Sequence, residues 1–379
     1  MDQKRRELEL YVHIPFCLQK CGYCDFLSAP WREEIREKYL KALNLEIEQA
    51  AEEAGGCRVV SIFFGGGTPT VLAGSQLAAL LKNLLKYFQA GEDCEITLEA
   101  NPGTLDAEKL EICRKAGFNR LSMGCQSASD RELKSLGRIH SYEDFLENFR
   151  LAREAGFRNI NVDLMSGIPG QTLDSWEETL TRTAELGPEH ISAYSLILEE
   201  GTPFYKARES LELPDEETER LMYERTAELL GRYGYRQYEI SNYAKEGFCC
   251  RHNLGYWTGR EYLGLGLGAA SLWEHARFRN TGSMEEYLAF SGDLNKIRRE
   301  KEELSEKDQQ AEYMILGLRL TQGISMEDFR KTFGAKAEEI WPGTVEKYKR
   351  YGLLEEADGY LRFTRKGISL SNVVLAEFL

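Results

Sequence analysis

The chain has 379 residues, which allows either two or three ordinary domains or one large barrel with an attached module. Its formal net charge of −14 argues against a broad electrostatic contact with nucleic acid. No window approaches the roughly 20 apolar residues of a transmembrane helix, which leaves peripheral association with a membrane as an alternative. The short basic run at residues 4–6 precedes no apolar leader, so the nine cysteines predict a cytoplasmic protein with reduced thiols rather than a disulfide framework.

Short β-rich runs alternate with longer helical patterns between residues 8 and 196. The runs with strand character are 8–14, 59–64, 94–100, 120–125, 159–165 and 190–196. The segments between them that carry apolar residues at helical spacing are 32–54, 74–88, 106–117, 141–156 and 172–187. This alternation is typical of βα units around a parallel sheet, and it predicts an α/β fold with a partial (β/α)6 barrel.

Unusual polar and glycine-rich residues follow the ends of these predicted strands. A cysteine run comes after the first strand, "GGGTPT" (65–70) after the second, Glu99 at the end of the third, Gln126 after the fourth and Asp163 near the end of the fifth. Barrels of this class carry their chemistry at the carboxyl ends of the strands. We therefore expect these residues to meet at one mouth of the barrel.

The regular alternation ends near residue 202. A helical pattern at 213–234 precedes an aromatic loop at 238–259. The glycine-alternating segment 262–271 predicts a strand whose glycines permit close approach of another chain or ligand.

A charged stretch at 295–309 is typical of a boundary or an exposed linker. We therefore predict two domains, a barrel domain over 1–295 and a smaller domain over 296–379. In the smaller domain, helical patterns precede a hairpin with Asp358-Gly359 at its turn, which predicts a winged-helix-like module. The module has no strongly basic recognition helix, so packing over the barrel is favoured over DNA binding.

Three cysteines, Cys17, Cys21 and Cys24, lie within "CLQKCGYC" just after the first predicted strand. Three thiolates suit one side of a 4Fe-4S cubane and leave one iron open to a ligand that is not protein. Zinc is the alternative, but its usual sites use a second ligand pair further along the chain, and no convincing pair is present. The cysteines predicted to be buried bystanders are Cys57, Cys94, Cys113 and Cys125.

The cysteine run on the first βα loop, together with "FFGGGTPT", resembles the radical S-adenosylmethionine (SAM) superfamily. The resemblance implies that the amino and carboxylate groups of SAM chelate the open iron. It also implies that one-electron reduction through the cluster can cleave SAM and release a 5′-deoxyadenosyl radical.

Segments along nearly the whole chain are similar to the oxygen-independent coproporphyrinogen III oxidase (HemN-like) family. They are "YVHIPFC", "GGGTPT", "EANPG", "RLSMGCQS", "LGRIH", "NVDLMSGIPGQT" and "GLGLGAAS". The resemblance implies that the cluster is held by Cys17, Cys21 and Cys24, and that SAM is bound by Tyr11, Tyr23, Gly66, Gly67, Thr68, Glu99, Gln126, Arg138 and Asp163.

Several of these roles also suit the chemistry of the side chains. Glu99 and Asp163 can accept hydrogen bonds from ribose hydroxyls or an ammonium group, and Arg138 can pair with a carboxylate. The alternatives are a surface ion pair for Arg138, a loop cap for Asp163, and simple packing for Tyr11 and Tyr23.

Two features depart from the oxidase and one points to another branch of the family. Phe26 stands where the oxidase has a further cysteine, and the first strand begins almost at once, whereas the oxidase has a longer segment before it. The hexapeptide "HNLGYW" matches the H-N-x-x-Y-W motif of the heme chaperone branch, HemW, and so implies heme binding by His252, Asn253, Tyr256 and Trp257.

A neutral imidazole can bind heme iron, and aromatic rings can cover the porphyrin. An ordinary hydrogen-bonded histidine is the alternative for His252. Ligation of heme by Cys249 or Cys250, just upstream of the motif, is disfavoured. The sequence therefore predicts a heme chaperone on a radical SAM scaffold, with a 4Fe-4S cluster, SAM and heme, that passes heme to an acceptor protein.

By resemblance alone, the chaperone is expected to be a homodimer. The alternative function is a radical SAM enzyme of the coproporphyrinogen dehydrogenase type that acts on a tetrapyrrole. A DNA-binding regulator that uses the C-terminal module is a third and less favoured class.

Overall fold

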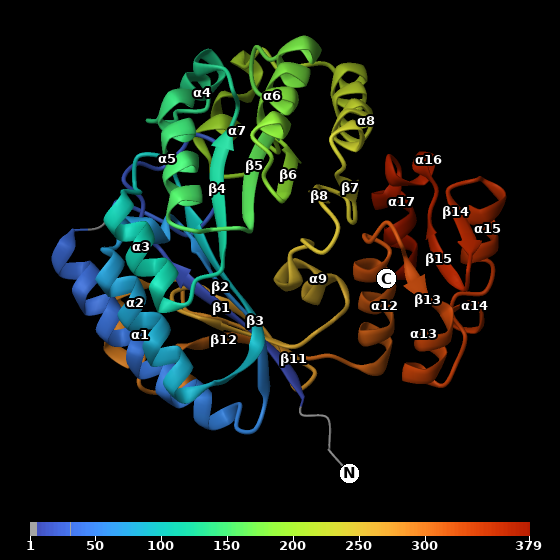
Figure 1. Cartoon of the computed structure of the whole chain (residues 1–379). Coiled ribbons are helices and arrows are strands. Elements are labelled where there is room, and N and C mark those ends of the chain that lie inside the picture. The colour runs from blue at the N-terminus through green and yellow to red at the C-terminus, as the bar shows by residue number, and fades with distance from the viewer. Residues whose placement is uncertain (1–5, 31) are drawn as a thin grey trace.

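The computed structural model describes residues 6–30 and 32–379, and it consists of a large open sheet wrapped by helices with a smaller domain beside it (Figure 1). Arg6 is the part of the basic run 4–6 that lies within the described residues. In this part of the chain, twelve strands form one sheet and three strands form a second. None of its helices is long and apolar enough to cross a membrane.

The first strands of the large sheet lie side by side in chain order and run parallel. They are β1 (Glu7–Ile14), β2 (Arg58–Gly66), β3 (Gln89–Ala100), β4 (Arg120–Gln126), β5 (Ile160–Ser166) and β6 (His190–Ser195). The helices between them are α1 (Glu33–Glu53), α2 (Gly74–Tyr87), α3 (Ala107–Ala116), α4 (Asp130–Ser135), α5 (Tyr142–Glu154) and α6 (Leu173–Glu185). The predicted partial (β/α)6 barrel is confirmed, and its sheet is open.

Further strands extend both edges of this sheet. Beyond β6 lie β8 (Asn242–Ala244) and β7 (Arg236–Gln237), and beyond β1 lie β9 (Tyr262–Leu265), β10 (Ala270–Trp273), β11 (Ala276–Asn280) and β12 (Arg298–Glu303). The strand β9 runs parallel to β1, whereas the other added strands pair antiparallel with their neighbours.

One sequence prediction is wrong in this region. Residues 262–271 do not form one strand, because the chain turns between β9 and β10 at Gly266 and Gly268, which have φ of 105° and 67°. The charged stretch 295–309 contains β12, which pairs with β11 at the edge of the large sheet and is exposed over residues 300–303. The predicted division after residue 295 falls within α11 (Leu294–Ile297), ahead of that strand.

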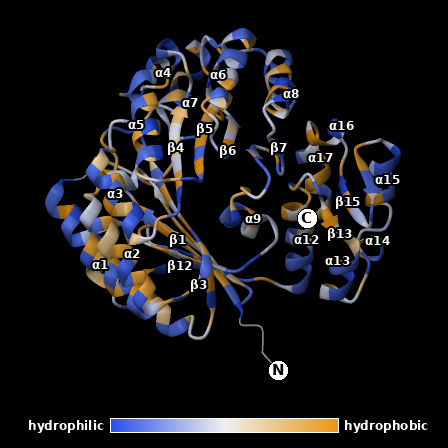
Figure 2. Cartoon of the chain, in the orientation of Figure 1, coloured by the Kyte–Doolittle hydropathy of each residue, from blue (hydrophilic) through white to orange (hydrophobic). Residues whose placement is uncertain are grey.

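The two faces of the parallel strands differ in chemistry. On β1, Leu8, Leu10 and Val12 are fully buried in the main core, which also contains residues of α1. Figure 2 shows hydrophobic residues along β1 and β3, whereas the surrounding helices mix hydrophobic and hydrophilic residues. The alternate residues on the inner side are polar or aromatic and include Glu9, Tyr11, Ser61, Arg120, Asn161 and Ser192. The concave side of the sheet therefore presents polar and aromatic side chains rather than an aliphatic core.

A short helix, α9 (Arg251–Trp257), contacts β2 on the concave side and lies between the barrel and the C-terminal domain in Figure 1. It follows α7 (Pro203–Ala207), α8 (Glu216–Arg232) and the edge strands β7 and β8. The predicted helix at 213–234 is confirmed, and the predicted aromatic loop at 238–259 contains α9.

The C-terminal domain has its own core and its own sheet. Its helices are α12 (Glu306–Gly317), α13 (Met326–Phe333), α14 (Ala337–Ile340), α15 (Thr344–Arg350), α16 (Arg365–Ile368) and α17 (Ser371–Leu375), and its strands are β13 (Ile324–Ser325), β14 (Leu354–Ala357) and β15 (Tyr360–Phe363). The predicted hairpin is confirmed, because Asp358 and Gly359 connect β14 to β15 with positive φ of 54° and 80°. A backbone bridge between Glu239 and Leu320 joins this domain to the barrel.

A buried carboxylate connects α1 to the turn between β9 and β10. Glu46 accepts hydrogen bonds from the backbone N–H of Gly266 at 2.8 Å, from the amide of Asn280 at 2.6 Å, and from the hydroxyl of Tyr287 on α10 (Met284–Phe290). Burial raises the pKa of Glu46 to about 7. The folded state therefore retains a proton on Glu46 at pH values where the unfolded chain has already lost it.

The substitution Glu46→Gln tests this anchor through the pH dependence of stability. The free energy of unfolding of the wild type should fall as pH rises between about 5 and 7, because the unfolded chain ionises there first. The amide of the variant cannot ionise, so the stability advantage of the wild type over the variant should shrink by roughly 2–3 kcal/mol from pH 5 to pH 8. Urea denaturation at a series of pH values measures the difference, with Glu37→Gln on the exposed side of α1 as the control.

Candidate functional site

A cavity of about 400 Å³ lies at the carboxyl ends of the parallel strands. Of the residues predicted for the cluster and SAM, those that line it are Cys17, Cys21, Cys24, Tyr23, Gly66, Gly67, Thr68, Glu99, Gln126, Arg138 and Asp163. The structure thus brings together every predicted residue of these two sets except Tyr11. Their convergence follows from the parallel sheet, which directs the ends of successive strands to one edge.

The three cysteines of the loop after β1 are partly exposed and free, whereas Cys57, Cys94, Cys113 and Cys125 are buried as predicted. Within residues 6–30 and 32–379, no group of three His, Cys, Asp or Glu side chains is placed to hold a single metal ion. Each thiolate of a cubane binds a different iron, so the sulfurs need only share a wall of the cavity. The loop meets that requirement.

The cysteine loop is fixed by hydrogen bonds to β1 and to its own far end. The backbone N–H of Cys17 donates to the carbonyl of Ala29 at 3.2 Å, and the Nε2 atom of His13 lies 2.8 Å from the carbonyl oxygen of Leu27. Burial lowers the pKa of His13, which favours the neutral imidazole. His13 is therefore a structural residue of the loop that the sequence analysis did not identify.

Side chains from two other loops reach the cysteine sulfurs. The hydroxyl of Thr68 donates to Sγ of Cys17 at 3.8 Å, and the guanidinium of Arg138 donates to Sγ of Cys21 at 3.6 Å. Asn101 joins these loops, since its amide donates to Thr68 at 2.7 Å and its oxygen accepts from Arg138 at 2.8 Å. Donors of this kind stabilise thiolates.

Two glycines at the carboxyl end of β2, Gly66 and Gly67, permit a close approach to the cysteine loop. A Cβ atom on Gly66, whose φ is 108°, would lie 2.5 Å from the ring of His13, and one on Gly67 would lie 2.6 Å from the carbonyl oxygen of Phe16. The backbone N–H of Gly67 donates to Ile14 and that of Thr68 to Phe16. These glycines are therefore required by the packing of the chain against itself, in addition to any ligand.

Two carboxylates, those of Glu99 and Asp163, line the cavity. Glu99 accepts a hydrogen bond from the backbone N–H of Gly66 at 3.3 Å, and Asp163 accepts from Ser122 and Asn161 at 3.1 and 2.8 Å. Burial, and then the charge of Asp163, raise the pKa of Glu99 to about 8, and burial also raises the pKa of Asp163. Polar hydroxyl or ammonium groups of a ligand would meet acceptors at this wall.

Gln126 and Arg138 occupy a tightly built part of the wall. Gln126 has a positive φ of 70°, next to an irregular register between β4 and β5. Arg138 donates to the carbonyl of Gly124 at 2.5 Å, and a Cβ atom on Gly124 would lie 2.7 Å from the Arg138 guanidinium. The position of Arg138 is therefore set by contacts with Gly124, Asn101 and Cys21 rather than by a surface ion pair.

A second, smaller cavity of about 210 Å³, the inner chamber, lies on the concave side of the sheet. Tyr11 lines this chamber together with His252, Asn253 and Tyr256 of α9. Gly66, Glu99 and Asp163 line both cavities, as do Phe26 and Tyr194, whose involvement the sequence analysis did not predict. The chamber lined by the predicted heme residues His252, Asn253 and Tyr256 therefore shares a wall with the cavity lined by the predicted SAM residues.

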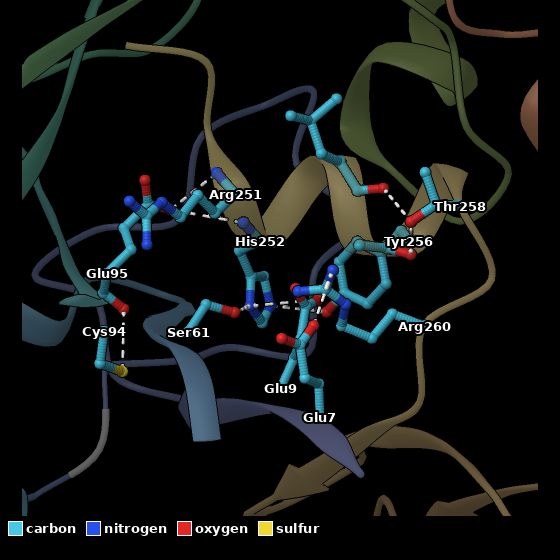
Figure 3. Close-up of polar contacts among 12 residues, drawn as sticks. Glu7, Glu9, Ser61, Cys94, Glu95, Arg251, His252, Tyr256, Thr258 and Arg260 are labelled. Atoms are coloured by element: carbon cyan, nitrogen blue, oxygen red, sulfur yellow. Dashed lines mark hydrogen bonds and ion pairs between the residues drawn. The ribbon is translucent and has the colours of Figure 1, made fainter. Parts of the chain in front are cut away.

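His252 is buried and both of its ring nitrogens have partners (Figure 3). Nδ1 lies 2.8 Å from the hydroxyl of Ser61, and Nε2 lies 2.9 Å from the hydroxyl of Tyr256. The ring stacks on Phe63 with centroids 5.1 Å apart. Burial lowers the pKa of His252 to about 3, so the imidazole is neutral. A neutral imidazole suits iron coordination, but Tyr256 must release Nε2 first.

Carboxylates from two strands hold α9 in place. Glu95 on β3 accepts hydrogen bonds from the backbone N–H groups of Arg251 and His252 at 3.0 and 3.3 Å, at the positive end of the helix. Glu9 on β1 is fully buried, and in the described structure neither of its carboxylate oxygens has a hydrogen-bond partner. Burial raises the pKa of Glu9 to about 8. Glu95 therefore caps the motif helix through hydrogen bonds, whereas Glu9 packs beneath it, 3.8 Å from Nδ1 of His252. Sequence patterns singled out neither residue.

The side chain of Trp257 lies apart from the side chains of His252 and Tyr256. It does not line the inner chamber, and the guanidinium of Arg319, from the C-terminal domain, lies 4.8 Å from its ring centroid. Positions i and i+4 of a helix share a face, which explains why His252 and Tyr256 point together and Trp257 does not.

The remaining histidines offer few other candidates for a ligand to heme iron. Within the described residues, His13, His140 and His190 are buried and have hydrogen-bond partners, whereas His275 lies exposed at the turn between β10 and β11.

Comparison with known proteins places these features in a family. The family model described as the Radical SAM superfamily matches residues 11–183, and the model described as the HemN C-terminal domain matches residues 304–370. The solved structure of coproporphyrinogen III oxidase (HemN) from Escherichia coli superposes with a TM-score of 0.85 at 25% identity, covering 99% of this chain and 90% of that one.

The fold and the site thus define a radical SAM protein with a HemN-type C-terminal domain. The heme chaperone HemW of Bacillus subtilis is 38% identical over 97% of this chain and 98% of its own length, and that of Escherichia coli is 35% identical over 98% of each. The chain belongs to the HemW family of heme chaperones.

The approach of Gly255 to Glu9 can be tested by substitution. A Cβ atom at Gly255 would lie 2.1 Å from the Glu9 carboxylate oxygens. Gly255→Ala should therefore reduce the free energy of unfolding by about 1–3 kcal/mol, and this cost should shrink when Glu9→Ala is also present. Urea denaturation measures the four proteins of the cycle. Gly231→Ala in α8, where a Cβ atom meets nothing within 4 Å, is the control and should be neutral or stabilising.

Proposed function

We propose that the protein is a cytoplasmic heme chaperone that binds heme and transfers it to an acceptor protein, on a scaffold that holds one 4Fe-4S cluster and SAM. The observation that carries the proposal is the position of the H-N-x-x-Y-W helix, with His252 and Tyr256 lining the inner chamber, which shares a wall with the cysteine-lined cavity. The full-length similarity to proteins named heme chaperones supports the same function.

In this proposal, Cys17, Cys21 and Cys24 hold the cluster. SAM occupies the cavity of about 400 Å³, with Glu99 and Asp163 on its hydroxyl or ammonium groups and the remaining predicted residues, except Tyr11, around it. The cluster supplies an open iron and electrons to SAM when both are bound. Thr68 and Arg138 contribute by donating to the cysteine sulfurs.

We also propose that the protein forms a homodimer across the mouth of the cavity. Four apolar side chains near the cysteine loop and the cavity rim are more than half exposed, namely Leu18, Phe26, Ile139 and Ile197. Exposed apolar groups that gather around one opening favour association. A dimer that covers this mouth would also cover the cluster.

Replacement of Cys17, Cys21 and Cys24 by serine tests the cluster and the dimer together. After anaerobic reconstitution, the triple variant should lack the brown absorption and the bound iron, because serine does not replace the thiolate ligands. Its elution in size-exclusion chromatography should shift to that of a monomer. Cys249→Ser, which removes a half-buried thiol outside the loop, is the control and should keep iron and dimer. Full iron content in the triple variant would refute the assignment.

Replacement of His252 by alanine tests the heme site. Heme affinity should fall by roughly tenfold or more, as expected when an iron ligand is lost, while the iron content of the cluster stays unchanged. His275→Ala, in an exposed turn, is the matched control. Tyr256→Phe keeps the aromatic ring but frees Nε2 of His252, so it should bind heme at least as tightly as the wild type. Heme titrations followed by absorption, with thermal unfolding alongside, provide the measurements.

A radical SAM enzyme that acts on a tetrapyrrole is the second candidate, and the likeness to the oxidase structure favours it. Anaerobic incubation of the reconstituted protein with SAM, dithionite and coproporphyrinogen III separates the two. Protoporphyrinogen IX formed over several turnovers would support the enzyme and remove the chaperone proposal. Phe26, which stands in place of the further cysteine and lines both cavities, argues for the chaperone.

A further inference from the structure

Helix α9 separates two cavities of different size. Its inner residues, His252, Asn253 and Tyr256, line the inner chamber of about 210 Å³. Its other residues, among them Arg251 and Leu254, line a cleft of about 620 Å³ between the barrel and the C-terminal domain, the outer cleft. Pockets that enclose organic ligands of drug size typically measure roughly 300–1,000 Å³. The outer cleft lies in that range and the inner chamber lies below it.

Three guanidinium groups line the outer cleft, those of Arg58, Arg251 and Arg260. Two carboxylates line it with them. Glu7 lies 3.4 Å from Arg58 and 3.2 Å from Arg260, and Asp93 pairs with Arg58 and lies 3.1 Å from Arg251. Among the side chains that line the cleft, three cations stand against two carboxylates, although the whole chain carries a net charge of −14. Arg260 also lies 3.7 Å from the buried carboxyl of Glu9, whose pKa burial raises to about 8, so Arg58 and Arg251 are the groups most open to an incoming anion.

The ion pairs of the outer cleft are open to exchange. The side chains of Arg58 and Arg251 are 38% and 50% exposed, and that of Asp93 is 59% exposed. Pairs with this exposure contribute little to stability. An incoming anion can therefore take the place of a carboxylate on either arginine at small cost to the fold.

The rest of the cleft mixes aliphatic side chains with the polar side chains of Thr258, Thr321 and Gln322, and one of its walls is fixed. Val60, Leu254 and Leu320 supply aliphatic surface between the charged groups. The wall formed by Leu320 and Thr321 of the C-terminal domain is held against the barrel by two hydrogen bonds. Thr321 donates through its backbone N–H to the carbonyl of Tyr238 and through its hydroxyl to the carbonyl of Gln237, both at 3.0 Å. A slot with aliphatic walls and cationic groups suits a flat, apolar molecule that carries carboxylates.

We propose that the outer cleft binds the porphyrin ring of the cargo, with its two carboxylates on Arg58 and Arg251 and its apolar face against Leu254 and Leu320. This inference rests on the proposed function. It adds a docking site for the ring on the side of α9 that faces away from His252, separate from the inner chamber in which His252 would bind the heme iron. Binding here depends on the carboxylates and the apolar ring, and it does not require iron.

Metal-free protoporphyrin IX and its dimethyl ester test the role of the carboxylates. The wild type should bind the diacid roughly tenfold or more tightly than the ester, because hydrogen bonds to charged groups are lost in the ester. Arg58→Gln/Arg251→Gln should lose most of this preference. Arg330→Gln, an exposed arginine on α13, should retain it. Quenching of porphyrin or protein fluorescence gives the affinities.

A second measurement requires no substitution. The thiol of Cys249 lines the outer cleft and is half-buried, so saturating protoporphyrin IX should slow its alkylation by N-ethylmaleimide several-fold, as read by peptide mass spectrometry. Unchanged alkylation of Cys249, or a double variant that still prefers the diacid, overturns the inference. Heme binding that depends on His252 in that same case leaves the proposed function intact, whereas the absence of heme binding to the wild type contradicts the proposed function itself.

Discussion

The structure depends on how an open sheet of parallel strands covers its inner face. Parallel strands are normally covered on both sides, yet the partial barrel has helices on the outside and a gap where further strands would close it. The chain fills this gap with α9, which is held by Glu95 from β3 and contacts Ser61 from β2. The helix therefore covers part of the concave side and leaves a cavity at the carboxyl ends of the strands.

The shared wall couples the two cavities electrostatically. Glu99 and Asp163 line both, and the charge of Asp163 contributes to the raised pKa of Glu99. A cationic ligand in the larger cavity would favour the ionised form of both carboxylates, because opposite charges nearby lower a carboxyl pKa. In the proposed function, SAM brings such a charge, so its binding would alter the electrostatic field in the chamber that holds His252.

The sequence predicted the parts of the molecule that depend on local periodicity and on the rules of parallel sheets. The six parallel strands, the helices between them and the meeting of Cys17, Glu99 and Arg138 at one mouth follow from those rules. The helical state of α9 could not be predicted, because its short sequence contains a glycine and its cap, Glu95, is 156 residues away from Arg251. The turn at Gly266 was missed for a similar reason, since it depends on Glu46 of α1.

The H-N-x-x-Y-W motif combines a structural role with the proposed binding role. His252 joins Ser61 to Tyr256 inside the barrel, and Trp257 contacts Arg319 of the C-terminal domain, so the helix links the two domains as well as closing the chamber. A histidine with both ring nitrogens engaged is a stable part of the fold until Tyr256 turns away. The same helix faces the outer cleft with its opposite side. A movement of α9 would therefore separate Nδ1 of His252 from Ser61 on β2 and change the shape of the outer cleft in one step, which gives a physical reason for the presence of both features on one short helix.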